Sequence, residues 1–412
     1  MATSTLLFDD ARGLTAPLTD YRPSFDIRTG ALTTRERLTS ALGLHVIALF
    51  VPGRLEALVR STAVGVTVNS LGAVDSDVLV LNGRCVLPIG QIRTLALGGC
   101  VLEKSSGDLI AARLSRHDAL ALAAGGFDPA VAARHKIELF DGHALLSRPW
   151  HVRTFRDAAL DADLATIEKK IETAFCPASS IRIGNRGLDI HPSAKVYPGV
   201  VFDCEAGPIV IDEGATIRPA CTIIGPVYIG RGVTILDRAL IKGHTAIGPS
   251  CKIAGEVGGT IFQGFANKAH DGHLGDSYVG EWSNLGAGTT NSNLLNTYGE
   301  VTCKPVPGGS NERSGLQFLG AIIGDHVKTA ISTRIMTGSI IHSGAMWAAA
   351  KAITGCVPPF AWVTDESEKR FRLDKFVDIA RTVMGRRKLT MSDSYEAVAR
   401  GLFESSSASS GT

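Results

Sequence analysis

The residues best suited to chemistry in this sequence form one short polar stretch, residues 267–276, which reads NKAHDGHLGD. Two histidines, His270 and His273, lie three residues apart in it, and Asp271 follows the first. An imidazole can accept a proton near neutral pH, so the stretch predicts general-base chemistry at His270. Asp271 could orient that imidazole or be a solvated carboxylate. His273 could contact a substrate or serve the structure, and a hydrogen-bonded structural role is the alternative for His270 as well.

The elements that position this stretch are predicted by a repeat. Isoleucine recurs at every sixth residue from Ile211 to Ile253, with glycine and proline in the gaps: Ile211, Ile217, Ile223, Ile229, Ile235, Ile241, Ile247 and Ile253. Neither the helical period nor simple strand alternation produces this spacing. Short strands joined by sharp corners would, with three strands to a coil and each isoleucine facing the axis. The repeat predicts a three-sided solenoid.

The rhythm begins at Ile190 and Val196, stops after Ile253, and returns at Val279, Leu285, Ile323, Thr329, Ile335, Ile341, Trp347 and Ile353. The polar stretch therefore lies in the break, and departures from a strong pattern are where function is expected. Residues 298–321 hold the run CKPVPGGSNERSG, which is too rich in proline and glycine to continue the coils. We expect them to leave the solenoid as a loop.

The two ends differ from the repeat. Residues 1–175 alternate β-rich and helical runs and predict an α/β domain, followed by the solenoid over residues 176–358. After Pro358 and Pro359 an apolar stripe predicts a helical cap over residues 359–404. The last segment, residues 405–412, has nothing to bury and is expected to be disordered.

The hexads resemble those of the left-handed parallel β-helix acyltransferases, and the handedness is expected from this resemblance alone. The run KAHDGHLGDSYVGEWSNLGAGTTNSN is similar to the active-site coil of the bacterial bifunctional uridyltransferase and glucosamine-1-phosphate N-acetyltransferase family. A divergent bacterial branch of sugar nucleotidyltransferases, with the LFDD opening and a truncated first domain, is more similar still. Members are typically homotrimers, with active sites between adjacent columns.

The resemblance implies roles for particular residues. His270 falls on the catalytic histidine and Asn284 on the asparagine that binds the amino sugar, while Ala287, Asn293 and, more weakly, Ala349 match positions that contact acetyl-CoA.

This sequence also departs from the family pattern at several positions. His273 replaces a tyrosine, Ile331 replaces a serine that helps to hold the cofactor, and Lys252 and Lys268 are the nearest candidates for phosphate binding. The acceptor is therefore less defined than the reaction.

The first domain matches the nucleotidyltransferase motif only in part. Arg12, Gly13 and the PLT at Pro17–Thr19 resemble its glycine-rich loop, and Arg22 precedes a proline that no lysine follows. Where the family has a metal-binding Gly-Asp, the sequence reads Gly83-Arg84. Phosphoryl transfer depends on that metal, so Mg²⁺ is expected only if this domain is active. A vestigial or sugar-binding domain is the alternative.

Composition excludes several classes of function. The 42 Lys and Arg residues balance 40 Asp and Glu, so neither nucleic acid nor a membrane is expected as a partner. The opening residues lack a signal-peptide pattern, and the eight cysteines show no CxxC pair. We expect a cytoplasmic protein with reduced thiols and no bound metal. The spacing of the histidines also gives no ligand set for a zinc-dependent hydratase of the γ-carbonic anhydrase type.

The leading hypothesis is N-acetylation of an amino-sugar phosphate or nucleotide-sugar by acetyl-CoA. The alternatives are acyl transfer from a carrier protein, active sugar-1-phosphate nucleotidyl transfer, and a non-catalytic trimeric scaffold.

Overall fold

The protein is described by a computed structural model, which covers residues 3–72, 77–167 and 176–408. It forms two compact units. The N-terminal unit comprises Met1–Gly13, Tyr21–Ile27 and Leu32–Ser147, and the prism unit comprises Leu14–Asp20, Arg28–Ala31 and Arg148–Thr412. The expected boundary at residue 175 is later than the observed one because helix α6 (His151–Ile167) belongs to the prism unit. The sequence over residues 161–175 is that of a polar helix leading into the column, and residues 168–175 lie outside the described residues.

The N-terminal unit is built on a seven-stranded mixed sheet in the order β3-β2-β1-β4-β6-β5-β7. The strands are β1 (Thr3–Phe8), β2 (Leu44–Phe50), β3 (Thr67–Val68), β4 (Val78–Asn82), β5 (Gly99–Glu103), β6 (Leu109–Leu114) and β7 (Lys136–Phe140). The helical elements are η1 (Ser24–Asp26), α1 (Thr34–Leu42), α2 (Gly53–Thr62), α3 (Gly90–Thr94), α4 (Arg116–Ala124) and α5 (Pro129–Ala132). A capping box between Thr33 and Glu36 starts α1. The predicted α/β class is confirmed.

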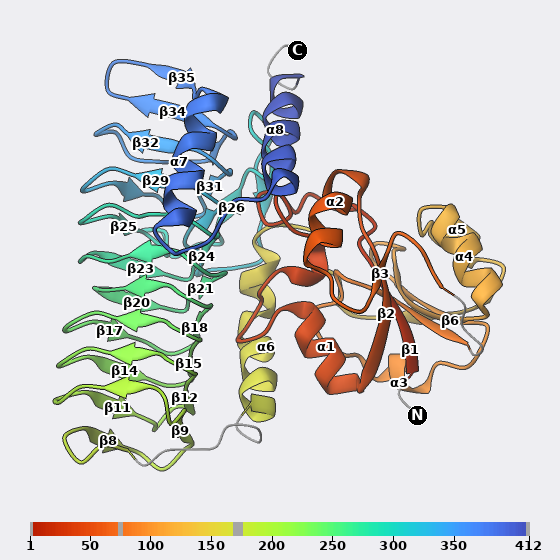
Figure 1. Cartoon of the computed structure of the whole chain (residues 1–412), viewed down its shortest axis with the longest axis horizontal. Helices are drawn as coiled ribbons and strands as arrows, with labels where there is room; N and C mark the ends of the chain where they lie inside the picture. Colours follow the sequence, from red (N-terminus) through yellow and green to blue (C-terminus); the bar gives the residue numbers. More distant parts are fainter. Residues whose placement is uncertain (1–2, 73–76, 168–175, 409–412) are drawn as a thin grey trace. The chain divides into compact units, whose positions relative to one another are not determined.

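The prism unit is a three-sided parallel β-helix (Figure 1, yellow-green to blue). Its first face contains β8 (Ile181–Ile183), β11 (Val201–Asp203), β14 (Thr222–Ile224), β17 (Leu240–Ile241), β20 (Glu256–Gly258) and β23 (His273–Gly275). Its second face contains β9 (Leu188–Ile190), β12 (Ile209–Ile211), β15 (Val227–Ile229), β18 (Thr245–Ile247), β21 (Ile261–Phe262), β24 (Tyr278–Val279), β28 (Ile322–Ile323), β31 (Ile340–Ile341) and β33 (Cys356–Val357).

The third face begins with β10 (Lys195–Val196), β13 (Thr216–Ile217), β16 (Thr234–Ile235), β19 (Lys252–Ile253) and β22 (Asn267–Lys268). Single bridges at Asn284 then connect it to β29 (Lys328–Thr329), β32 (Met346–Ala348), β34 (Ala361–Thr364) and β35 (Glu368–Arg370).

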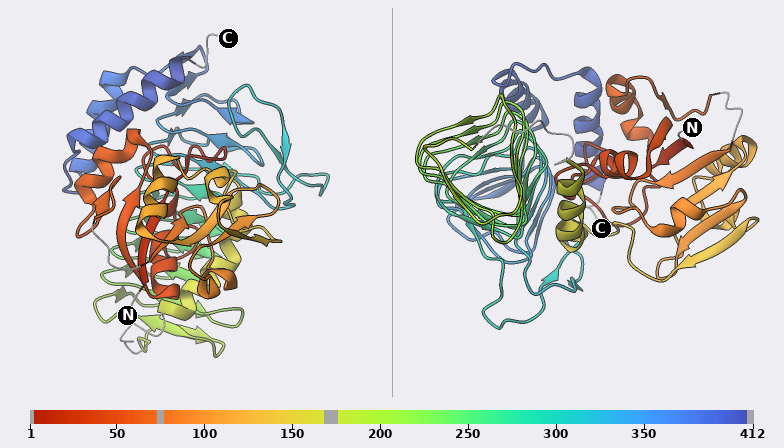
Figure 2. Two further views of the ribbon diagram at one scale, coloured as in Figure 1. Left: turned by 90° about the vertical axis from the view of Figure 1, so that its right-hand side faces the viewer. Right: turned by 90° about the horizontal axis from the view of Figure 1, so that it is seen from below.

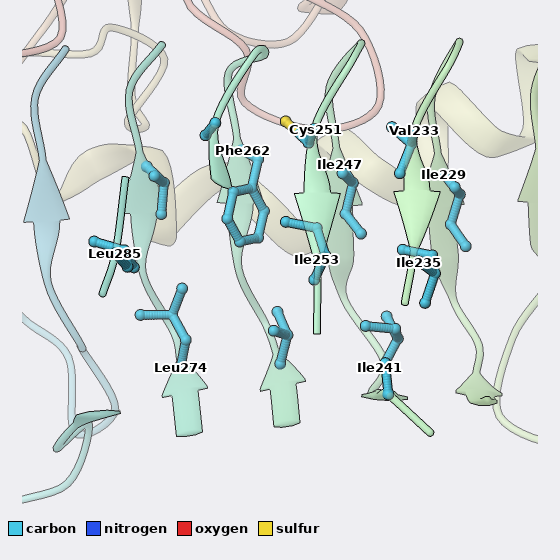
Figure 3. Packing of buried hydrophobic residues seen from close by; sticks show 14 of the residues in the cluster. Ile229, Val233, Ile235, Ile241, Ile247, Cys251, Ile253, Phe262, Leu274 and Leu285 are labelled. Atoms are coloured by element: carbon cyan, nitrogen blue, oxygen red, sulfur yellow. The ribbon is translucent and has the colours of Figure 1, made fainter. Parts of the chain in front are cut away.

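The repeat builds the core of this unit. All eight isoleucines from Ile211 to Ile253 are completely buried, and those of successive coils stack on one another inside the column (Figure 3). Burying one such side chain stabilises the fold by about 1.5–3 kcal/mol. The later positions, from Val279 to Ile353, are also buried, so the predicted hexad register is confirmed.

The column is interrupted where the sequence rhythm breaks. The ladder of the first face stops at β23, and β25 (Thr290–Asn291) pairs instead with β30 (Arg334–Ile335). Between them the chain leaves the coils in a hairpin of β26 (Thr302–Cys303) and β27 (Glu312–Arg313), which projects from the column (Figure 2). The predicted loop is confirmed, with an antiparallel pair inside it.

Two helices, α7 (Leu373–Gly385) and α8 (Asp393–Ala408), follow the last coil. The predicted stripe holds, since Phe376, Ala380 and Met384 of α7 are buried. Helix α8 continues to Ala408, four residues into the segment expected to be disordered, and residues 409–412 lie outside the described residues. Among the helices that the structure describes, none has the length and apolarity needed to cross a bilayer.

Candidate functional site

The polar stretch forms one corner of the interrupted coil. Strand β22 ends at Lys268, β23 begins at His273, and the chain between them turns from the third face to the first. His270 and Asp271 are exposed at this corner. Within the described residues no hydrogen bond involves the imidazole of His270. Of the two roles considered for Asp271, the exposed carboxylate is the one observed, because it forms no hydrogen bond with the imidazole.

Lys268 holds the corner from inside. It pairs with Ile253 in the ladder and is only 2% exposed. Its ammonium Nζ donates to the carbonyl oxygens of Ala254 at 3.1 Å, His270 at 3.0 Å and Asp271 at 3.3 Å. Burial lowers its pKa to about 8, although the charge of Asp271 opposes this change. All three donors are used within the turn, so this lysine is not placed to bind the phosphate for which it was a candidate.

Gly272 is required by close packing at the same corner. Its φ of +107° is unfavourable for residues with a side chain, and a Cβ atom there would lie 2.2 Å from the carbonyl oxygen of Thr289. The corner that presents His270 is therefore fixed by a lysine on one side and by a glycine contact on the other.

His273 lies on the first face beside a charged pair. Its Nδ1 is 3.4 Å from Oε1 of Glu256, which also accepts from Nζ of Lys242 at 2.5 Å. The hydrogen bond from Lys242 is the main reason why the pKa of Glu256 is lowered. Sequence reasoning missed this pair. Lys242 follows the hexad position Ile241 by one step and must therefore face outward, but Glu256 lies beyond Ile253, where the hexads stop.

Helix α6 ties the corner to the rest of the prism unit through Asp276. Its Oδ1 accepts from Nε of Arg153 and Nη1 of Arg156, both at 2.8 Å. Arg156 also donates to the carbonyl oxygen of Gly259 and is 4% exposed. The amide of Asn293, a predicted cofactor contact, donates to Oδ2 of Asp276 at 2.8 Å. This side chain thus helps to hold Asp276.

The other predicted residues are spread along the column. Asn284 is exposed and bridges Asn267 and Lys328 on the third face, where it lines a cavity of about 280 Å³ together with Lys252. Ala287 is partly buried, and its carbonyl oxygen accepts from the amide of Ser332 at 2.6 Å. Ala349 is buried next to β32, two strands further along the third face than Asn284, which is about 10 Å at the strand spacing of a sheet. Only an extended ligand could contact all of them.

The N-terminal unit does not fit magnesium. Arg84, in place of the expected carboxylate, is 1% exposed and donates from Nε and Nη2 to Asp10 at 2.8 and 2.7 Å and from Nη2 to Asp108 at 2.6 Å. Burial alone would lower the pKa of Arg84, but hydrogen bonds and charge from the two aspartates raise it. Asp10 and Asp108 are thus both paired with Arg84, and Asp108 also with Arg12, so neither carboxylate is placed to bind the ion.

The predicted nucleotide contacts lie in the same unit. Arg12 donates to Asp108 at 3.2 Å, next to Gly13, whose φ is +82°. Arg22 is only 7% exposed, so it is not accessible to a phosphate. Only Arg12 and Gly13 therefore remain as candidates for contacts to a ligand.

Comparisons with known proteins place both parts of the chain in context. Residues 5–172 match the family described as "Sugar nucleotidyl transferase". The chain is 32% identical over 163 residues, 39% of its own length, to a "Bifunctional protein GlmU" of Methanococcus aeolicus, of which the match spans 38%. It is 35% identical over 134 residues, 32% of its length, to a "Bifunctional sugar-1-phosphate nucleotidylyltransferase/acetyltransferase" of Sulfurisphaera tokodaii, of which the match spans 33%.

Among solved structures, a hexapeptide transferase family protein from Anaplasma phagocytophilum covers 54% of this chain and 96% of its own, with 12% identity and a TM-score of 0.23. A likeness at that score says nothing about activity.

Proposed function

We propose that this chain transfers an acetyl group from acetyl-CoA to an amino-sugar phosphate or nucleotide-sugar. The proposal agrees with its similarity to GlmU-like bifunctional enzymes and with the match of residues 5–172 to the sugar nucleotidyl transferase family. The observation that carries the proposal is the exposed imidazole of His270 on a corner held by Lys268. A base with a free nitrogen on a rigid turn is what attack by an amine on a thioester requires.

The reaction follows from these groups. The sugar amine attacks the thioester carbonyl carbon while a ring nitrogen of His270 takes the amine proton, and the C–S bond then breaks. The products are an amide and the thiol of CoA, to which the proton is returned. Asn284 and His273 would contact the sugar, and Ala287 and Ala349 would lie along the extended acetyl-CoA.

We further propose that the chain works as a homotrimer, in which the exposed corner faces a cleft shared with a second copy. The buried Arg84–Asp10 pair favours a first domain that does not catalyse magnesium-dependent nucleotidyl transfer. A carrier-protein thioester is the alternative donor, because the corner itself does not specify the length of the acyl chain.

The test is release of free thiol from acetyl-CoA by the purified chain in the presence of a panel of amino-sugar phosphates. His270→Ala should reduce the rate by about 10²–10⁴, the usual contribution of a general base. His117→Ala, at an exposed histidine of the N-terminal unit, is the matched control and should change nothing. Thiol release from acyl-carrier protein but not from acetyl-CoA would show that the acyl donor is the carrier protein. Turnover that survives His270→Ala would refute the mechanism, and UTP with a sugar 1-phosphate should release no pyrophosphate.

A further inference from the structure

A strongly basic cavity lies on the third face of the prism. Lys252, Asn267, Asn284 and Lys328 occupy successive outward positions across this face, as the ladder and the two bridges show. Arg386 and Arg387, at the end of α7, line the same cavity of about 280 Å³. We call this set, with its four cationic side chains, the basic cavity.

Arg387 is held in place by hydrogen bonds to the column. Arg387 donates from Nη1 to the carbonyl oxygen of Ser250 at 2.7 Å and from Nη2 to Oδ1 of Asn267 at 2.8 Å. Further along α7, Phe376 packs edge-on against His326 of the column, with ring centroids 5.3 Å apart. The end of the helix is thus fixed over the cavity, and the guanidinium group of Arg387 does not have to be ordered when a ligand binds.

The charges of the basic cavity are not balanced from within. None of the described residues that line it is acidic. The one hydrogen bond described for the ammonium of Lys328 is to the carbonyl oxygen of His326 at 3.4 Å, and burial lowers the pKa of this lysine to about 8. Bringing four cations together without an anion is unfavourable, and a bound dianion would relieve their repulsion.

The wall of the cavity also indicates the size and kind of ligand. Phe265 and Trp282 stack with centroids 4.5 Å apart and line one side, while the amides of Asn267 and Asn284 lie between the lysines. The volume suits a phosphate or diphosphate group with part of a sugar or nucleoside, not a macromolecule.

We propose that the basic cavity binds the phosphate or diphosphate group of a small phosphorylated ligand, held by Lys252, Lys328, Arg386 and Arg387. Asn284 belongs both to this cavity and to the proposed acetyl-transfer site. The inference therefore rests on the proposed function for the identity of the ligand, but not for the binding of a phosphate group. The phosphate could belong to the acceptor sugar or to CoA, because both carry the same chemistry.

Binding can be measured without turnover, by calorimetry and by the fluorescence of Trp282. The probes are inorganic pyrophosphate, glucosamine 1-phosphate against glucosamine, and CoA against both dephospho-CoA, which lacks only the 3′-phosphate, and pantetheine, which also lacks the diphosphate. Wild type should bind pyrophosphate, and either the sugar phosphate or CoA should bind at least tenfold more tightly than its partner lacking that phosphate. The pair of probes that shows this difference in affinity identifies whether the bound phosphate belongs to the acceptor sugar or to CoA. Affinity should also fall with added salt.

Lys252→Ala and Arg386→Ala, both at exposed residues, should each weaken pyrophosphate binding roughly tenfold or more, since hydrogen bonds to charged groups contribute most. Lys195→Ala, an exposed lysine at the far end of the same face, is the control and should bind as wild type does. Equal affinities in all variants, or no binding of any probe, would overturn the inference. Tight binding without acetyl transfer would refute only the proposed function, and acetyl transfer with unchanged affinities in the variants would refute only this inference.

Discussion

The regular coils of the prism, residues 211–253, and the interrupted coils, residues 262–329, share three faces but fill them differently. In the regular coils every hexad position is a fully buried isoleucine. In the interrupted coils the inward positions include Lys268, Asn291 and Thr329, which are 2%, 6% and 7% exposed. Apolar burial is not directional, whereas a buried polar group must have partners in defined positions.

These polar residues meet that requirement locally. The side chain of Asn291 accepts from the amide of Gly275 at 2.8 Å and donates to its carbonyl oxygen at 3.0 Å, and Lys268 uses all its donors at the corner. The regular coils thus supply stability, while the interrupted coils give up apolar burial to fix a particular backbone shape. Substitutions in the two regions should have different signatures. Three of them test this contrast, and a fourth concerns a buried histidine in the coils beyond residue 329.

The largest loss of stability is expected in the regular coils. Ile235→Ala removes a fully buried side chain that stacks between the coils above and below, and should lower the free energy of unfolding by about 2–5 kcal/mol. All four tryptophans of the chain belong to the prism unit, so their fluorescence during urea unfolding reports on it alone. Val201→Ala, at a half-buried position on the first face, is the control with a smaller loss. Equal losses of unfolding free energy in the two variants would mean that the buried hexad positions do not contribute more to the stability of the column than a half-buried position does.

In the interrupted coils a polar substitution should approach that loss. Asp276→Asn leaves the buried guanidinium of Arg156 opposite a neutral amide, at a cost of about 2–4 kcal/mol. Asp157→Asn is the matched control, because this carboxylate contacts the same arginine at 2.7 Å but is 44% exposed, and it should cost less than about 1 kcal/mol. If the two variants unfold alike in urea, Asp276 is not the anchor between α6 and the coil.

Much of this organisation could be predicted because the regular coil has a constant length. Ile235 pairs with Ile253, 18 residues later, so a fixed step of six identifies every inward residue. The next pair, Ile253 and Lys268, is separated by only 15 residues. Once a coil shortens, the spacing no longer tells which residue faces the axis, so it could not show that Lys268, a candidate for phosphate binding, points inward. The exposure of His270 could be predicted, because a polar residue at a break in the hexads is not expected to point into the apolar core.

The basic cavity could not be predicted in the same way. Arg387 and Asn267 are 120 residues apart in sequence and meet only because α7 folds back over the third face. Helix periodicity predicts the buried stripe of α7 but not which part of the column it covers. The sequence shows that Arg84 stands where a metal-binding carboxylate is expected. It does not show that Arg84 pairs with Asp10, because that contact depends on the order of the strands in the sheet.

A buried histidine in the resumed coils tests whether polar residues there need partners. His342 is 4% exposed, and neither ring nitrogen hydrogen-bonds with any described residue. Burial lowers its pKa from 6.5 to about 4. Between these values the unfolded chain binds the proton and the folded chain does not, so stability falls as pH falls from 6.5 towards 4. At pH 5 the loss is about 2 kcal/mol relative to pH 7.

The loss at His342 is measured by urea unfolding at both pH values. His342→Gln should remove this part of the pH dependence, whereas His117→Gln, at a histidine whose side chain is 92% exposed, should leave it intact. The same slope in wild type and in His342→Gln would show that the loss comes from other groups.

The smallest effect on stability is expected at Lys268. A substitution there distinguishes a residue that fixes the shape of the corner from one that stabilises the whole fold. Lys268→Met keeps an unbranched side chain of similar volume inside the column but removes the ammonium that binds three carbonyl oxygens. Two of these belong to the exposed residues His270 and Asp271, which water can reach, so the free energy of unfolding should change by only about 1 kcal/mol. Acetyl transfer should nevertheless fall about tenfold, because a small displacement of the base away from the reacting amine is costly. Lys195→Met controls for the lost charge and should affect neither quantity. Full activity in Lys268→Met would show that Gly272 and its neighbours set the corner without the lysine, and the contrast between stabilising and shaping coils would then not extend to this residue.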